Sequence, residues 1–229
     1  MFPARPRNGS DVPDTTPLPP PLPALAAQAD RLIDLGVPAL AGLTADEVRS
    51  FAAEAGGGAG GALLAVHPAA LPASALAPLL RHAERPGFVV TDMPDVDLFA
   101  PTDVELPDGP LYLVDGVDRG DRMSNWSPDE ALPALAAEGR TPLLLTEGMH
   151  WVLQTPDVLV RNHCFMTIGS RLRKADGSWD ARTPAIWISN GTGRDGRERR
   201  DAPKIGWCWW NNRHTWLGFG STTGRRPTA

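Results

Sequence analysis

The first hydrophobic pattern of the chain is helical and lies between residues 24 and 61. From Ala24 to Gly36, apolar side chains recur at the spacing of one helix face. Thr44 and Glu47 have the spacing of a capping box, which predicts a second helix that continues through Ala52. The glycine run from Gly56 to Gly61 then breaks the pattern, and we interpret it as a flexible link.

Between residues 62 and 145, short apolar runs alternate with helix signals. The runs predict strands over 62–66, 88–91, 111–114 and 142–145, with a helix near 74–83. Ser127, Pro128 and Glu130 form a strong helix start, and Gly139 ends that helix. The tripeptide Arg119-Gly120-Asp121 spells an integrin-binding sequence, which we interpret as a coincidence.

The last third of the chain is predicted to be mainly β. A helix begins at Thr146 and continues through Leu153, and Pro156 interrupts it. Runs rich in β-branched and aromatic residues then predict strands over 164–168, 185–189, 205–210 and 215–219. We interpret residues 211–213 as the turn of a hairpin between the last two strands. The result is a β-meander that carries five of the eight tryptophans.

Together these elements predict an α+β fold, in which an N-terminal helical region packs on a mostly antiparallel, tryptophan-rich sheet. Residues 1–23 contain eight prolines and are predicted to be a disordered tail. Residues 24–61 form the helical region, and residues 62–229 form the α+β core domain.

Charge and composition narrow the classes of function. Residues 1–140 hold 20 acidic and 9 basic side chains, whereas residues 141–229 hold 7 and 13. The acidic front argues against a general nucleic-acid-binding protein. No apolar run approaches the roughly 18 residues of a membrane helix, and two cysteines cannot form a disulfide framework. We therefore expect a cytoplasmic protein that binds neither nucleic acid nor membrane; its oligomeric state is left open.

Two stretches are similar to a known group of sequences. The first is Asn162-His163-Cys164-Phe165 followed by Gly169-Ser170-Arg171, and the second runs from Ala202 to Trp209 and is followed by His214-Thr215-Trp216-Leu217-Gly218. They resemble an actinobacterial domain family of unknown function, over roughly residues 60 to 226. The segment from Gly193 to Asp201 is an arginine-rich insertion relative to that pattern. The resemblance implies membership of a group without implying an activity.

The first candidate catalytic site consists of two thiols and two imidazoles, those of Cys164 and Cys208 with His163 and His214. A cysteine nucleophile needs a thiolate stabilised by a nearby imidazolium. Adjacent strand residues point to opposite faces, so His163 cannot readily serve Cys164, whereas His214 could serve either thiol. The alternatives are a cysteine-dependent enzyme for acyl or thiol transfer, or two buried core cysteines.

The second candidate is a metal site at Glu147 and His150, which stand three residues apart on one face of a predicted helix. Di-iron bundles use such Glu-x-x-His pairs, but no second pair is found in this sequence. His163 or His214 would have to complete a mononuclear set. We assign no metal and no cofactor, and interpret Glu147 as a helix-capping carboxylate and His150 as a buried histidine.

A glycine- and arginine-rich segment after residue 190 is the third candidate. It has the Gly-x-Gly-x-x-Gly spacing of a dinucleotide fingerprint, but the helix that should follow is missing. Two interpretations stay open, an exposed solvated loop or an anion-binding loop. The binding groups of such a loop would be Arg194, Arg197, Arg199 and Arg200.

Aromatic residues give the favoured function, a small-molecule-binding domain. Trp207 and Trp209 share one face of their predicted strand, and Trp216 lies across the predicted hairpin from them. Either helices cover both faces of the sheet, or one face lines a cleft for a flat or apolar ligand. The polar contacts to an anionic ligand would come from Arg171, Asn212, Arg213 and His214.

Overall fold

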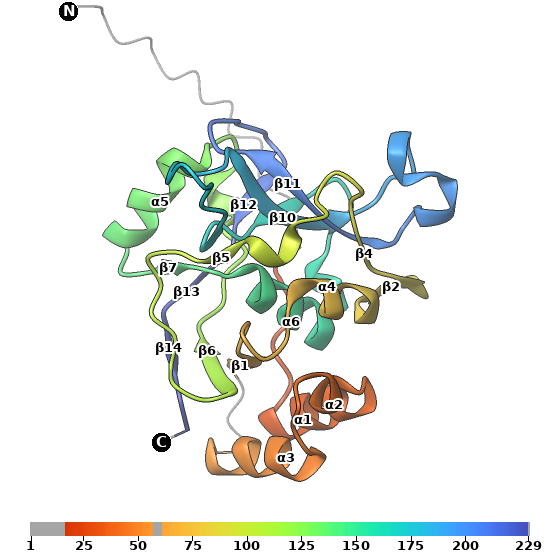
Figure 1. The fold of residues 1–229 in the computed structure, drawn as a ribbon, viewed down its shortest axis with the longest axis vertical. Coiled ribbons are helices and arrows are strands. Elements are labelled where there is room, and N and C mark those ends of the chain that lie inside the picture. The colour runs from red at the N-terminus through yellow and green to blue at the C-terminus, as the bar shows by residue number, and fades with distance from the viewer. Residues whose placement is uncertain (1–16, 57–60, 229) are drawn as a thin grey trace, which may run out of the picture.

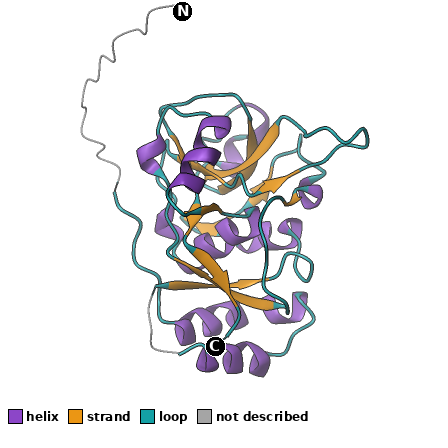
Figure 2. Cartoon of the chain, turned by 90° about the vertical axis from the view of Figure 1, so that its left-hand side faces the viewer, coloured by secondary structure: helices purple, strands orange, loops and turns teal. Residues whose placement is uncertain are grey.

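The computed structural model describes residues 17–56 and 61–228. Helical and sheet layers alternate along the long axis of the molecule (Figures 1 and 2). In Figure 1 the N-terminal helices lie at the bottom, followed upward by a small sheet, a middle layer of helices and a larger sheet. The fold is α+β, as predicted, and most strand pairs are antiparallel. The N-terminal helices, however, pack on the small sheet and not on the larger, tryptophan-rich sheet as predicted.

The N-terminal helices are α1 (Leu25–Asp34), α2 (Val37–Leu40) and α3 (Ala45–Glu54). The predicted capping box of α3 is present: Thr44 Oγ1 accepts from the Glu47 N–H at 3.2 Å, and the Glu47 carboxylate accepts from the Thr44 N–H at 2.7 Å. Gln28 is buried in α1, where its amide donates to Ala62 O and accepts from Leu64 N–H. It therefore ties α1 to the edge of the first sheet.

The first sheet is antiparallel and has the order β1-β6-β14. Its strands are β1 (Ala62–Val66), β6 (Leu111–Asp115) and β14 (Gly224–Arg226). The helices α1 and α6 (Leu145–Gln154) both contact β1, and every residue of β1 is buried. Every residue of α6 is buried as well, so this helix forms the centre of the core.

The second sheet has the order β12-β8-β10-β11-β4. Its strands are β12 (Leu217–Phe219), β8 (Cys164–Met166), β10 (Arg182–Ile188), β11 (Pro203–Trp209) and β4 (Phe88–Val89). β10 pairs antiparallel with both β8 and β11. At the two edges of the sheet, β12 runs parallel to β8 and β4 runs parallel to β11.

The predicted hairpin between residues 205–210 and 215–219 is wrong. β11 pairs with β10. β12 pairs instead with β8, which lies on the opposite side of β10 from β11. The alignment of Leu217 with Cys164 and of Phe219 with Met166 gives β12 a buried apolar face beside β8. This non-local pairing separates residues that a hairpin would have brought together.

Helices cover both faces of the second sheet, which is one of the two alternatives that the tryptophan pattern left open. Phe165 and Ile186 belong to the core that includes α6, and a Cβ on Gly148 of α6 would lie 3.1 Å from either side chain. On the other face, Met166 and Ala185 pack with α5 (Pro128–Ala137). The central strands β8 and β10 are therefore mostly buried on both faces.

Two predicted elements end elsewhere in the structure. The helix expected near 74–83 is α4 (Ala73–Leu76) and a 3₁₀ turn (Ala77–Leu79), because Pro78 has no N–H to continue an α-helix. A hairpin of β2 (Arg81–His82) and β3 (Arg85–Pro86) follows. The strand expected over 142–145 is only β7 (Thr141–Pro142), paired with β13 (Ser221–Thr222), because α6 begins at Leu145.

Residues 1–16 and 57–60 lie outside the described residues, and with them most of the predicted tail and the predicted glycine link. Within the remaining tail, Leu22 packs on the core, and the carbonyl of Pro17 accepts from Arg119 Nη2 at 2.7 Å. The end of the proline-rich segment therefore takes part in packing, contrary to the prediction. Among the helices of residues 17–56 and 61–228, none has the length and apolar character needed to cross a bilayer.

Candidate functional site

The tryptophans predicted to line one pocket lie in two places. Trp207 and Trp209 pack edge to face with ring centroids 4.5 Å apart. Trp216 stacks on His214 at 4.8 Å, just before β12. Three strand spacings, roughly 14 Å, separate β11 from β12. The predicted pocket is therefore not a single site, because it depended on the hairpin.

The polar residues of the predicted turn also have separate roles. Arg213 pairs with Glu130 of α5 at the surface. Asn212 lies beside the Cys208 thiol and lowers its pKa, against the larger effect of burial. The half-exposed His214 ring makes no side-chain hydrogen bond within the described part of the chain. Asn212 and Arg213 therefore do not face one ligand site together with Trp207.

Neither cysteine has the environment of an activated nucleophile. Burial raises the pKa of the Cys164 thiol well above its ordinary value, and Cys208 adds to this effect. Burial also raises the pKa of Cys208. A reactive thiolate requires the opposite shift, so the geometry favours the interpretation of both residues as core cysteines.

Glu147 and His150 are fully buried and saturated by protein groups. The Glu147 carboxylate accepts from Tyr112 Oη at 2.9 Å and from Arg225 Nε at 2.6 Å. His150 Nδ1 lies 2.7 Å from Thr146 O, and its Nε2 accepts from Val66 N–H at 3.3 Å. Burial lowers the pKa of His150 to about 4. Glu147 also caps α6 through the N–H of Leu144, so these residues are a capping carboxylate and a buried histidine.

The arginines of the β10–β11 connection diverge. The connection turns around the buried Asp195, which accepts from Ser189 Oγ at 2.7 Å and from Lys204 Nζ at 2.8 Å. Arg194 pairs with Asp92, and the Arg199 guanidinium lies 4.5 Å from the centroid of the Phe88 ring. Arg197 and Arg200 are exposed. The four side chains therefore form no common anion site in the described structure.

A different cavity contains the predicted ligand residue Arg171. It encloses about 390 Å³ beside β9 (Ser170–Arg171), which pairs with β5 (Ala100–Pro101). The Arg171 guanidinium lies 3.7 Å from the centroid of the Trp210 ring and 5.4 Å from that of Trp179. Asp129 of α5 accepts from Trp210 Nε1 at 3.1 Å and fixes this ring.

The charge of Arg171 has no countercharge in contact with it. The residue is 8% exposed, and Nη2 donates only to the carbonyl of Asp180, at 3.1 Å. Its buried Nε has no hydrogen-bond partner, and no carboxylate within residues 17–56 and 61–228 forms an ion pair with it. The Asp180 carboxylate pairs with Arg182 instead. Burial lowers the pKa of Arg171, and the more distant charge of Asp180 opposes this shift.

A second arrangement was missed by the sequence interpretation. Arg119 is buried, and its Nε and Nη2 donate to the two carboxylate oxygens of Asp121 at 2.8 and 2.5 Å. His163 Nε2 lies 2.6 Å from Asp121 Oδ1. Gly120 has a φ of 74°, and a Cβ there would collide with the carbonyl of Phe219. The tripeptide dismissed as a coincidence is thus a tight turn that holds His163, and its glycine was the available signal.

Comparison with known proteins gives a family but no activity. The model of a family of unknown function (DUF5701) matches residues 31–228. The match confirms the expected membership of a family of unknown function, and it extends into the N-terminal helices. No curated protein and no solved structure matches the chain.

Proposed function

The chain belongs to this family of unknown function, and we propose from its own geometry that it binds a small organic anion, a monocarboxylate with a flat apolar body, at Arg171. The observation that carries the proposal is the buried guanidinium without a countercharge. A carboxylate in the cavity would receive the charge-assisted hydrogen bonds that Arg171 does not make within the protein.

The energy of burial explains why this arrangement points to a ligand. Removing an arginine charge from water costs several kcal/mol unless an opposite charge and hydrogen bonds replace the water. Stacking on Trp210 offsets roughly 1 to 2 kcal/mol of that cost. The hydrogen bond to the Asp180 carbonyl offsets a further part, and the orphan Nε leaves the guanidinium only partly compensated.

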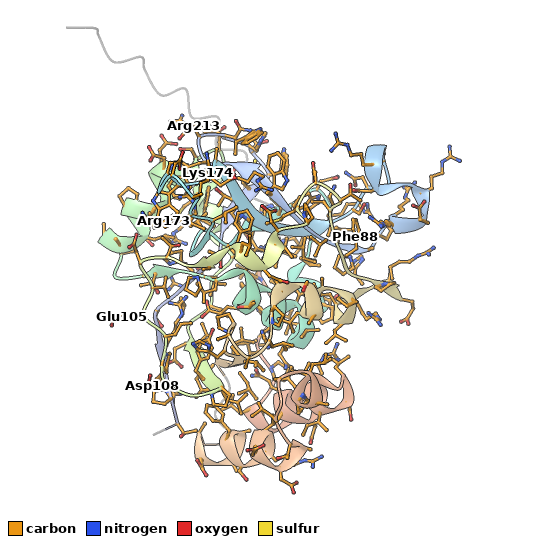
Figure 3. The ribbon with its side chains drawn as sticks, viewed as in Figure 1. Phe88, Glu105, Asp108, Arg173, Lys174 and Arg213 are labelled. Carbon is orange, nitrogen blue, oxygen red and sulfur yellow. The ribbon has the colours of Figure 1, made fainter. Side chains whose placement is uncertain are left out.

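The walls of the cavity indicate what kind of anion fits. Leu132, Ile168 and the two tryptophans provide apolar surface for a ring. Figure 3 shows Arg173, Lys174 and Arg213 at one end of the long axis and Glu105 and Asp108 further along it. Arg173 stacks on Trp179 at 4.4 Å, so positive charge lies beside the cavity.

Acidic lining residues limit the charge of the ligand. Asp103 and Asp180 both line the cavity. The Asp180 carboxylate pairs with Arg182, whereas that of Asp103 would repel an anion of high charge. A single carboxylate, able to bind the guanidinium at a distance from Asp103, is therefore favoured over a phosphate ester. Benzoate has this chemistry and is a suitable probe.

The test compares benzoate with benzamide, its neutral analogue, by calorimetry at constant ionic strength. We expect wild-type protein to prefer benzoate by at least about tenfold, which corresponds to the roughly 1.5 kcal/mol of a hydrogen bond to a charged group. Arg171→Met should remove the preference. Arg226→Met is the control, because it removes an exposed arginine that does not line the cavity, and it should change the preference less than about twofold.

Two results would contradict the proposal. One is equal binding of benzoate and benzamide by the wild-type protein. The other is a preference for benzoate that persists in Arg171→Met, because the anion would then be held elsewhere.

We also propose a cytoplasmic location. Cys164 and Cys208 are both free thiols, as in proteins of reducing compartments. Fractionation of the native host tests this proposal, and recovery of the protein from the envelope or the medium would overturn it.

A further inference from the structure

A second cavity opens where β8 and β12 begin and β10 ends. It encloses about 340 Å³. Its lining residues are Asn162, His163, Trp187, Ile188, Asn190 and Trp216. It contains two of the indole rings and the histidine that Asp121 holds, and it shares no lining residue with the Arg171 cavity.

The Asp121 carboxylate determines which nitrogen of His163 is available. Burial raises the pKa of Asp121, but His163 and Arg119 together outweigh it and lower the pKa to about 2, so this carboxylate is ionised and acts as an acceptor. His163 Nε2 must then carry the proton that it shares with Asp121 Oδ1, 2.6 Å away. In the neutral ring the other nitrogen, Nδ1, bears a lone pair and has no hydrogen-bond partner in the described structure.

We propose that this cavity binds a planar, uncharged heterocycle with an N–H group, and that the N–H donates to His163 Nδ1. Trp187 and Trp216 provide aromatic surface against which such a ring packs. A partly buried acceptor favours ligands that donate to it over isosteric ligands that cannot.

The local backbone supports a preformed site. Asn162 has a φ of 58°, and this left-handed turn leads directly into His163 and β8. On the other wall, Trp216 is stacked on His214 with an angle of 30° between the rings. The Asn190 side-chain oxygen accepts from Arg161 Nη1 at 3.2 Å, so the orientation of this amide is fixed as well.

A matched pair of probes tests the hydrogen bond. Benzimidazole has a ring N–H, and 1-methylbenzimidazole has the same ring system without it. Ligand-observed NMR should show binding of benzimidazole about five- to tenfold tighter than that of the methylated probe, as expected for one hydrogen bond.

Three variants separate stacking from hydrogen bonding. His163→Phe should reduce the preference between the two probes to about one. Trp216→Ala should weaken both probes and leave the preference unchanged. His67→Phe removes a histidine outside the cavity and should alter neither value.

A measurement on the wild-type protein keeps the test valid if His163→Phe fails to fold. Histidine ¹⁵N spectra at pH 8.5, where a histidine is ordinarily neutral, should show a protonated Nε2 and an unprotonated Nδ1 for His163. Benzimidazole should shift the Nδ1 signal, and 1-methylbenzimidazole should not.

Equal affinity for both probes, an unchanged preference in His163→Phe, or an Nδ1 signal that benzimidazole leaves in place would overturn the proposal. The outcome is independent of benzoate binding. Failure of the Arg171 proposal would therefore leave this one standing, and the converse also holds.

Discussion

Two buried arginines at different levels of the molecule have opposite surroundings. Arg225 of β14, whose side chain is 4% exposed, donates to both oxygens of the fully buried Glu147, to Thr141 Oγ1 and to Pro142 O. Arg171 of β9 donates to one backbone carbonyl and otherwise contacts tryptophan rings. The first charge is neutralised by the protein, and the second is not.

This difference assigns a structural role to one arginine and a binding role to the other. The Glu147 cluster joins α6, β6 and β14, and Tyr112, Leu144 and Arg225 all donate to its carboxylate. Such a cluster offers nothing to a ligand, because its lone pairs and N–H groups are already used. Arg171 is the opposite case, because its uncompensated charge lies next to an open cavity.

The largest effect is expected from breaking the closed cluster. Arg225→Met should lower the free energy of unfolding by about 3 to 5 kcal/mol, because Glu147 would be left as a buried charge without its partner. Urea denaturation measures this change. The control is Arg226→Met, which removes an adjacent exposed arginine that pairs with Asp115 and should cost less than about 1 kcal/mol. Similar losses in both variants would show that Glu147 does not need Arg225.

The next effect is the response of the same region to acid. His150 has a folded pKa of about 4 and an ordinary value of 6.5. Between these pH values the unfolded chain binds more protons than the folded one, so stability is full above pH 6.5 and falls as the pH approaches 4. The shift in the pKa of His150 corresponds to a loss of about 3 kcal/mol in the free energy of unfolding.

The effect of His150 is measured as a slope. Urea denaturation between pH 7 and 4 should show a loss of stability that is clearly shallower in His150→Gln, whatever the absolute stability of that variant. The four other histidines are common to both proteins and cancel in the comparison. Parallel curves would mean that His150 is not buried as a neutral ring.

The features of the fold and the candidate sites that could be predicted from the sequence are those that depend on residues close together along the chain. The capping pairs Thr44 with Glu47 and Ser127 with Glu130 are three residues apart, and both form. Glu147 was interpreted as a capping carboxylate and His150 as a buried histidine, and the structure shows both. Local spacing is sufficient for such features, since one helical turn brings the groups together.

Pairings across long stretches of chain could not be predicted in this way. Arg225 meets Glu147 across 78 residues, and nothing in either local sequence marks the pair. The same limitation produced the wrong hairpin, because a short turn after β11 was preferred to a strand that crosses to β8. The sequence did identify Arg171, but its neighbours Trp179 and Trp210 became evident only from the strand arrangement.

The smallest effect on stability is expected at Arg171, and it is the sharpest test of the comparison. In Arg171→Met an apolar side chain of similar length removes an uncompensated charge, which stabilises the fold, and loses the stacking on Trp210, which destabilises it by roughly 1 to 2 kcal/mol. Urea denaturation without ligand should therefore place this variant within about 1 kcal/mol of the wild-type protein. A loss near that of Arg225→Met would mean that Arg171 has a structural partner after all. An unchanged stability together with lost benzoate binding would show that this charge is kept for a ligand.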